Sequence, residues 1–206
     1  MRYLIYSIIL TLNAACSSDY RLMTPGENFR CPQIPTIYPI ENTWFTTTVD
    51  VAGRHISGLL LIKKMEDNSR RVVFTSESGL TFFDFEFAST GDFIVHHIVK
   101  MMDKKAVIST LRKDFDLLLG NYFQSPAASM SRMNNELYIG SQKNNETAYL
   151  VLADSCNSLL RLELASARTK KVTVESYPDF FHLPDSIHVR HYTFDMNIHL
   201  VQLVKN

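Results

Sequence analysis

Histidines are the side chains in this 206-residue chain that could most readily hold a metal or move a proton, and their spacing favours neither role. His96 and His97 are adjacent in a stretch that we expect to be helical, so they point about 100° apart and make a poor metal pair. His188 and His191 are three residues apart on an expected strand, which sends them to opposite faces of the sheet. We therefore expect no metal site and no cofactor.

Carboxylates occur in two close pairs, Asp84 with Glu86 and Asp114 with Asp116, and such pairs usually mark a solvated face. The chain also lacks a glycine-rich phosphate loop, a serine nucleophile elbow and a Cys-x-x-Cys pair. Enzymes need reactive groups that converge, and no such set can be assembled from this sequence. We expect a protein that is not an enzyme.

The overall charge excludes another large class of function. The chain has 21 basic and 21 acidic residues, so its formal net charge is zero, and no Lys/Arg-rich run interrupts this balance. These properties argue against a nucleic-acid partner. An apolar share of 46% suits a globular domain that buries its own core.

The N-terminal residues have the pattern of an export signal. Met1 and Arg2 are followed by an apolar run at 3–12 that is too short to span a bilayer well, and two alanines precede Cys16. Small residues before such a cysteine resemble the signal of bacterial lipoproteins. The resemblance implies that residues 1–15 are a signal peptide and that Cys16 carries acyl chains such as palmitate, which anchor the protein to a membrane. The alternative is an ordinary secretory peptide with a coincidental cysteine.

The remaining cysteines, Cys31 and Cys156, could form a disulfide in an oxidising compartment. That bond would join the N-terminal arm to the late part of the sheet. Two buried thiols are the alternative, since spacing alone does not decide the geometry.

The chain divides into an arm and one domain. Residues 16–40 are rich in proline and poor in periodic apolar residues, which predicts an extended tether between the anchor and the domain. Residues 41–206 contain no repeat, no low-complexity tract and no linker, so we expect a single domain there.

Strand patterns dominate this domain. About four strands are expected before residue 90 and about five after residue 135, all suited to antiparallel pairing. In one of them Phe83, Phe85 and Phe87 share a face, with Asp84 and Glu86 on the other.

Residues 93–119 have a helical apolar spacing and predict one or two amphipathic helices. Asp92 is the expected N-cap, Asp103 would cap a second helix, and Gly120 would end the stretch. Helices between two sets of strands imply an α+β fold in which the helices lie on one face of an antiparallel sheet.

This arrangement resembles the lipoprotein-localisation factors of the bacterial outer membrane, the LolA/LolB-like fold. The segments that carry the resemblance are GLLLIKK, RVVFTSESGLTFFDFEF, KDFDLLLG and LPDSIHVRHYTFDMNIHLVQL, and it covers most of residues 44–204. The resemblance implies a strongly curved antiparallel sheet of about nine or more strands, an incomplete barrel that wraps its helices around an apolar cavity.

If the fold is of this kind, residues that point inward become candidates for the cavity lining. Methionine and phenylalanine adapt well to flexible acyl chains, although the same residues at these spacings more often form a solid core. The candidates are Leu60, Ile62, Phe83, Phe85, Phe87, Ile98, Met101, Met102, Leu111, Phe115 and Met196.

We therefore expect a membrane-anchored lipoprotein of the outer membrane that shelters lipid, or the acyl chains of lipoproteins, during transport in the cell envelope. The alternative is a non-enzymatic accessory lipoprotein that uses the half-barrel as a docking platform for an envelope protein partner.

Overall fold

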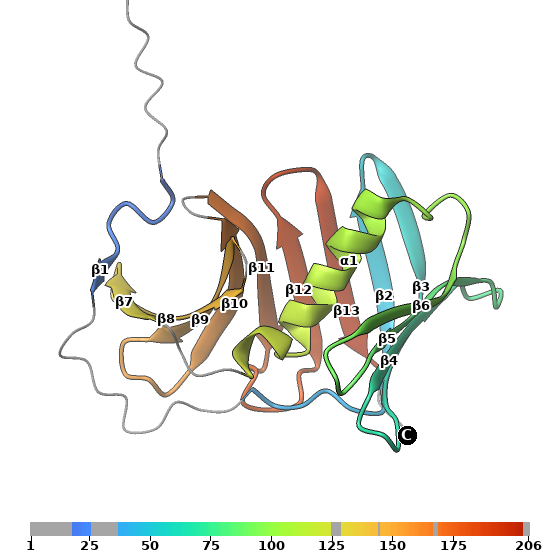
Figure 1. The fold of residues 1–206 in the computed structure, drawn as a ribbon, viewed down its shortest axis with the longest axis horizontal. Coiled ribbons are helices and arrows are strands. Elements are labelled where there is room, and N and C mark those ends of the chain that lie inside the picture. The colour runs from blue at the N-terminus through green and yellow to red at the C-terminus, as the bar shows by residue number, and fades with distance from the viewer. Residues whose placement is uncertain (1–17, 26–36, 125–128, 144, 167–168, 204–206) are drawn as a thin grey trace, which may run out of the picture.

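A computed structural model describes residues 18–25, 37–124, 129–143, 145–166 and 169–203. These residues form one antiparallel sheet of thirteen strands and one α-helix, which crosses the concave face of the sheet (Figure 1). The expected fold class, a curved and incomplete barrel with helical structure on its concave face, is confirmed.

The strand order is β1-β7-β8-β9-β10-β11-β12-β13-β2-β3-β4-β5-β6, so β1 and β6 are the two edges and the sheet does not close. The strands are β1 (Thr24–Pro25), β2 (Thr43–Val51), β3 (Arg54–Lys64), β4 (Arg70–Thr75), β5 (Thr81–Phe87), β6 (Phe93–Ile98), β7 (Ser129–Met133), β8 (Glu136–Lys143), β9 (Glu146–Ala153), β10 (Leu159–Ser166), β11 (Thr169–Tyr177), β12 (Ser186–His191) and β13 (Met196–Gln202). The helices are α1 (Lys105–Leu118) and the short 3-10 helix η1 (Asn121–Phe123).

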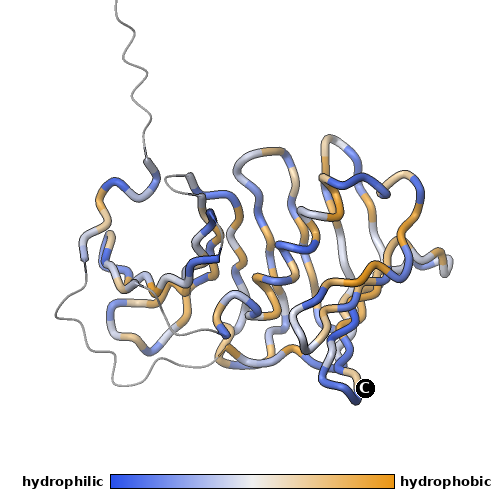
Figure 2. Tube along the Cα trace, viewed as in Figure 1, coloured by the Kyte–Doolittle hydropathy of each residue, from blue (hydrophilic) through white to orange (hydrophobic). Residues whose placement is uncertain are grey.

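The pattern of β5 is confirmed. Phe83, Phe85 and Phe87 are buried, and the Phe83 and Phe85 rings stack with centroids 4.5 Å apart. Asp84 faces the other way and forms an ion pair with Arg71 on β4. A similar alternation of buried and more exposed residues is found in β3 and β4, and Figure 2 shows how hydrophobic and hydrophilic residues are distributed along the chain.

The predicted helical stretch 93–119 is wrong in its first part. Residues 93–98 form β6, which pairs with β5, and Gly91 (φ +91°) lies in the turn between the two strands. His96 is therefore on a strand, where its Nε2 lies 2.6 Å from a carboxylate oxygen of Glu86. A short apolar run rich in Ile and Val fits either period, and pairing with β5 decides the outcome here.

The two ends of α1 fit the sequence prediction unequally. Its N-cap is Lys104, with no side-chain capping bond, so neither Asp92 nor Asp103 caps a helix. Gly120 does end the helix, as predicted, because it takes a left-handed conformation (φ +73°) and its N–H donates to the carbonyl of Leu117.

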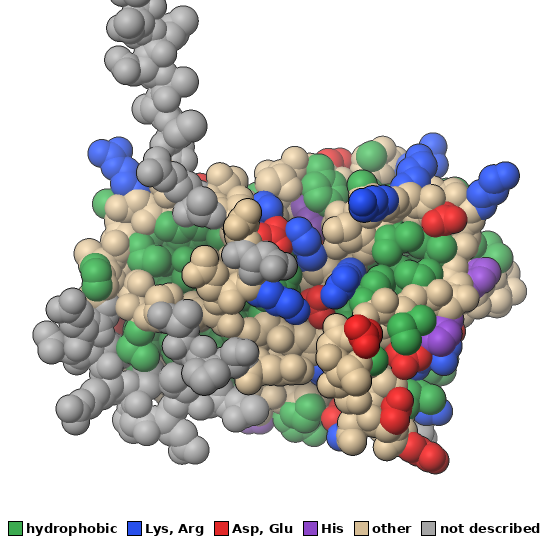
Figure 3. All heavy atoms as spheres, in the orientation of Figure 1, with side chains coloured by type: hydrophobic (Ala, Val, Ile, Leu, Met, Phe, Trp, Pro, Cys, Tyr) green, Lys and Arg blue, Asp and Glu red, His purple; other side chains and the backbone are tan. Residues whose placement is uncertain are grey.

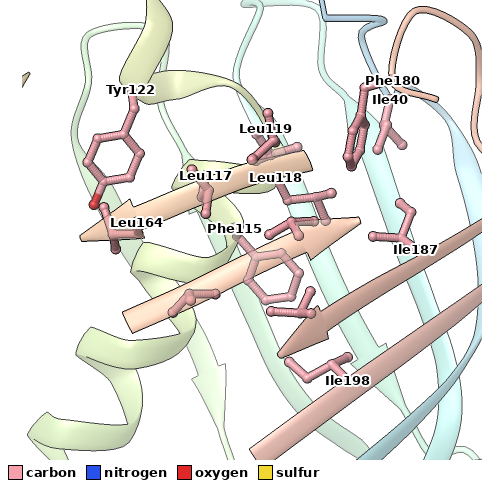
Figure 4. Close-up of a cluster of buried hydrophobic side chains, with 14 of the residues drawn as sticks. Ile40, Phe115, Leu117, Leu118, Leu119, Tyr122, Leu164, Phe180, Ile187 and Ile198 are labelled. Atoms are coloured by element: carbon pink, nitrogen blue, oxygen red, sulfur yellow. The ribbon is translucent and has the colours of Figure 1, made fainter. Parts of the chain in front are cut away.

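The core lies between the C-terminal half of α1 and the sheet. Residues 114–119 are all buried, so the helix is enclosed on every side at this end. Phe115, Leu117 and Leu118 face strand residues such as Leu164 and Ile198 (Figure 4). Ile40 and Phe180, which come from segments outside the strands, lie side by side at one end of this cluster (Figure 4).

Part of the expected tether is attached to the domain. Tyr20 donates its hydroxyl hydrogen to Glu163 (2.8 Å), and its ring contacts those of Tyr138 and Tyr149. Thr24–Pro25 pairs with β7. Residues 18–25 therefore lie on β7–β10 rather than spanning free space.

Leu117 tests the contribution of the helix to the core. We expect Leu117→Ala to lower the free energy of unfolding by about 2–5 kcal/mol, because a fully buried leucine loses both its burial and its packing. Leu160→Ala, at a side chain that is 38% exposed on β10, is the control and should cost less than about 1 kcal/mol. Urea unfolding measures both, and equal losses would contradict this packing.

Candidate functional site

An apolar pocket of about 450 Å³ lies between the N-terminal half of α1 and the concave face of the sheet. Figure 3 shows hydrophobic side chains gathered in this part of the molecule, with Lys and Arg side chains along the upper edge. The pocket is lined by Val49, Val51, Arg54, Ile56, Phe74, Phe83, Met101, Met102, Ala106, Val107, Thr110, Leu111, Phe194 and Met196.

The pocket exists because α1 is held tightly at one end only. Its C-terminal half is buried, whereas Ala106 is exposed and Val107 is half-buried at the other end. Ala106 and Thr110 are small, so they leave space between the helix and the strands that a larger side chain would fill. The hairpins β2–β3 and β12–β13 form the opposite wall.

The chemistry of the walls suits an apolar ligand with one polar end. Arg54 and Thr110 carry the polar side-chain groups of the lining, and the other lining residues are apolar. Met101, Met102 and Met196 supply flexible, polarisable side chains that adapt to ligands of variable shape. The volume lies within the usual range for small-molecule sites.

Five of the eleven predicted lining residues border this pocket: Phe83, Met101, Met102, Leu111 and Met196. The other six do not. Ile98 is partly buried against the core, and five are buried within it: Leu60, Ile62, Phe85, Phe87 and Phe115. Phe115 packs on Phe83 and Phe87, with ring centroids 5.8 and 6.4 Å apart, and so closes the concave face beneath the pocket.

Sequence reasoning missed several lining residues. Val49 and Val51 alternate on β2 and could have been found from strand parity, and Val107 precedes Leu111 by one helical turn. Phe194 had no such signal, because it lies in the β12–β13 hairpin.

A buried polar pair lies behind the pocket wall. Asp114 of α1 and His191 of β12 are both buried, and His191 Nε2 lies 3.1 Å from Asp114 Oδ2. The His191 ring contacts Phe194, which lines the pocket, with centroids 4.6 Å apart. The expected solvated face at Asp114 and Asp116 is thus wrong, because the helix turns both carboxylates inward.

The environment of Asp114 is electrostatically costly. Burial raises the pKa of the Asp114 carboxyl, and the contact with His191 opposes that shift. Asp114 Oδ1 has no hydrogen-bond partner in the part of the chain that the structure describes. The buried Asp114 carboxylate therefore depends on its contact with His191. This contact links α1 to the sheet at the level of the pocket.

Other predicted sites can be placed only in part. Cys16 and Cys31 lie outside the described residues; Cys156 is disulfide-bonded, and its pairing with Cys31 stays a prediction. Across the described ranges, no group of three His, Cys, Asp or Glu side chains is placed to hold a metal ion. None of the helices in those ranges has the length and hydropathy needed to cross a bilayer.

Comparisons with known proteins find similarity to solved structures but none in sequence. No family model matches the sequence, and no curated protein matches it. A similar solved structure is that of a DUF1329 family protein from Desulfovibrio piger ATCC 29098, with 6% identity over 79% of this chain and 84% of that one. Its TM-score is 0.39.

The Asp114–His191 pair gives a pH-dependent prediction. His191→Leu leaves the Asp114 carboxylate buried without its partner, and we expect a loss of about 3 kcal/mol in unfolding free energy near pH 8. The loss should shrink as the pH falls toward the ordinary aspartate pKa of about 4. Without His191 nothing from that residue opposes the rise of the Asp114 pKa, so the native variant takes up the proton at a higher pH than the native wild type or the unfolded chain does.

Urea unfolding of His191→Leu at pH 8 and pH 5 measures this change. The exposed His199 on β13 provides the control, and His199→Leu should show little loss at either pH. A loss in His191→Leu that is the same at both pH values would contradict the account.

Proposed function

We propose that this protein is a membrane-anchored lipoprotein that shelters an acyl chain of a lipid or lipoprotein in the pocket beside α1. The observation that carries the proposal is the pocket itself, which is open, almost wholly apolar and rich in methionine. The lipoprotein-like signal ending at Cys16 supports a place in the cell envelope. Sheltering an acyl chain forms and breaks no covalent bond, so the proposed function needs no catalytic group.

Burial of apolar area would drive binding. Each methylene removed from water contributes about 0.8 kcal/mol, so ten of them contribute about 8 kcal/mol before the cost of ordering the chain is subtracted. The net affinity should therefore be micromolar or weaker, which suits a carrier that must also release its ligand.

Arg54 would orient the ligand. It is an exposed cation that lines the pocket at the start of β3, and no ion pair holds it within the described residues. A carboxylate or phosphate could lie against its guanidinium group while the acyl chain extends toward Phe83 and Leu111. The ligand would thus enter with its apolar end first.

The architecture also supports a transport role of the LolA/LolB kind in the outer membrane. An open, curved antiparallel sheet with a helix on its concave face is the arrangement that the sequence resemblance implies. In such a fold the pocket moves lipid or lipoprotein acyl chains through an aqueous space by excluding water from them.

A second candidate function is a docking platform for an envelope protein. The observation that favours it is the edge strand β6, where Ile94 and Val95 are exposed and one side has no neighbouring strand among the described elements. Solvent extraction and mass spectrometry of the purified protein distinguish the two functions. Recovered acyl lipid supports the carrier, and a dry protein supports the platform.

Ala106 offers a direct test of ligand binding. We expect Ala106→Trp to weaken binding of a fluorescent fatty acid by about tenfold or more, because the indole fills the space that the acyl chain would occupy. Ser109→Trp adds the same side chain to an exposed position of α1 outside the apolar pocket, and it should bind as the wild type does. If both variants bind equally well, the pocket is not the site.

A further inference from the structure

The attachment of residues 18–25 determines where the membrane anchor leaves the domain. The backbone N–H of Lys170 donates to Asp19 (2.7 Å), and Tyr20 is held by Glu163. Cys16 precedes Asp19 by three residues, and a fully extended chain spans at most about 3.6 Å per residue, so an anchor at Cys16 reaches only about 10 Å from this point. An acylated Cys16 would therefore hold the start of β11 close to the membrane.

The mouth of the apolar pocket lies at the end of the strands where β11 begins. By an edge of the sheet we mean here such a line of strand ends, and not the edge strands β1 and β6. Because the strands alternate in direction, the β10–β11, β12–β13 and β2–β3 hairpins all lie at one edge, and α1 begins there as well (Figure 1). Lys170 Nζ lies 5.7 Å from the centre of the Tyr192 ring, and Tyr192 precedes the pocket residue Phe194 by two positions. A continuous set of contacts thus leads from Asp19 to the pocket.

The side chains at this edge are those of a membrane interface. Met101, Tyr192 and Phe194 are 58%, 50% and 44% exposed. Basic residues surround them, namely Arg54, Lys100, Lys104 and Lys105, all exposed and without an ion pair in the described part of the chain. Exposed acids also lie here, namely Asp50, which pairs with His55, Asp103 and Asp195, so the surface is amphipathic and has a small excess of basic residues. Aromatic residues together with such cations suit the headgroup region of an anionic bilayer.

We infer that this edge, which we call the hairpin edge, docks on an anionic lipid bilayer and that the pocket opens directly onto it. This inference rests on the proposed function of the pocket. It adds the partner, an anionic bilayer, and the orientation of the domain on that bilayer. The short link to the anchor holds the hairpin edge against the membrane, the exposed apolar side chains enter the headgroup layer, and the four cations contact lipid phosphates. An acyl chain then passes between bilayer and pocket without crossing water.

Tryptophan quenching tests this orientation in the full chain. Trp44, the single tryptophan of the sequence, lies at the start of β2 and so at the opposite edge of the sheet. Tyr192→Trp combined with Trp44→Phe moves the indole to the hairpin edge, at a position that does not line the pocket. Vesicles of phosphatidylethanolamine and phosphatidylglycerol with brominated acyl chains quench only an indole that lies near the lipid.

We expect strong quenching in the Tyr192→Trp/Trp44→Phe protein and none of Trp44 in the wild type. Adding Lys100→Glu and Lys104→Glu should weaken the docked state about thirtyfold or more, the effect expected of two basic residues at an anionic surface. The matched change Lys63→Glu with Lys64→Glu, at the other end of β3, should leave the quenching unchanged. Equal quenching of both indoles, no quenching of either, or equal effects of the two lysine pairs would overturn the inference.

Binding of a fluorescent fatty acid, measured without vesicles, separates this inference from the proposed function. Lys100 and Lys104 do not line the pocket, so their variants should bind the fatty acid as the wild type does. Failure of the proposed function would appear as absent fatty-acid binding with the quenching pattern intact. Failure of the inference would abolish the pattern while fatty-acid binding remains.

Discussion

Burial of the C-terminal half of α1 against the concave face of the sheet is the constraint on which the rest of this structure depends. Residues 114–119 are all buried, and this packing fixes the C-terminal end of the helix against the sheet. The helix is straight and the sheet is curved, and contact at one end therefore leaves space at the other. The same packing that forms the core thus creates the pocket, and no separate element is needed to build it.

The Asp114–His191 pair adds specificity to this packing. A buried pair of polar groups contributes little net stability compared with apolar residues of the same size, but it strongly disfavours arrangements in which one partner is left alone. Here the pair links α1 to β12 beside Phe194, at the boundary between the solid core and the pocket. We infer that it fixes the position of the helix along the strands and so maintains the shape of the pocket.

Much of the fold could be predicted from local patterns, and the errors arise where long-range contacts decide. The alternation at Phe83, Phe85 and Phe87 and the helix end at Gly120 depend on neighbouring residues, and both predictions are confirmed. The sequence predicts a helix at residues 93–98 because a short apolar run has no unique period, and only pairing with the neighbouring β5 makes this segment a strand. Strand parity predicted that Leu60 and Phe85 point inward but not their depth, which is why they lie in the core and not in the pocket.

The measurement that tests the central claim most directly is the NMR spectrum of ¹³C-labelled methionine methyl groups during titration with palmitate. Met102 and Met196 line the pocket, whereas Met130 lies on β7, on the far side of the sheet order, and serves as an internal reference. The account predicts saturable shifts of the Met102 and Met196 methyl signals and a constant Met130 signal. Unchanged signals from Met102 and Met196, or equal shifts of all three, would contradict it.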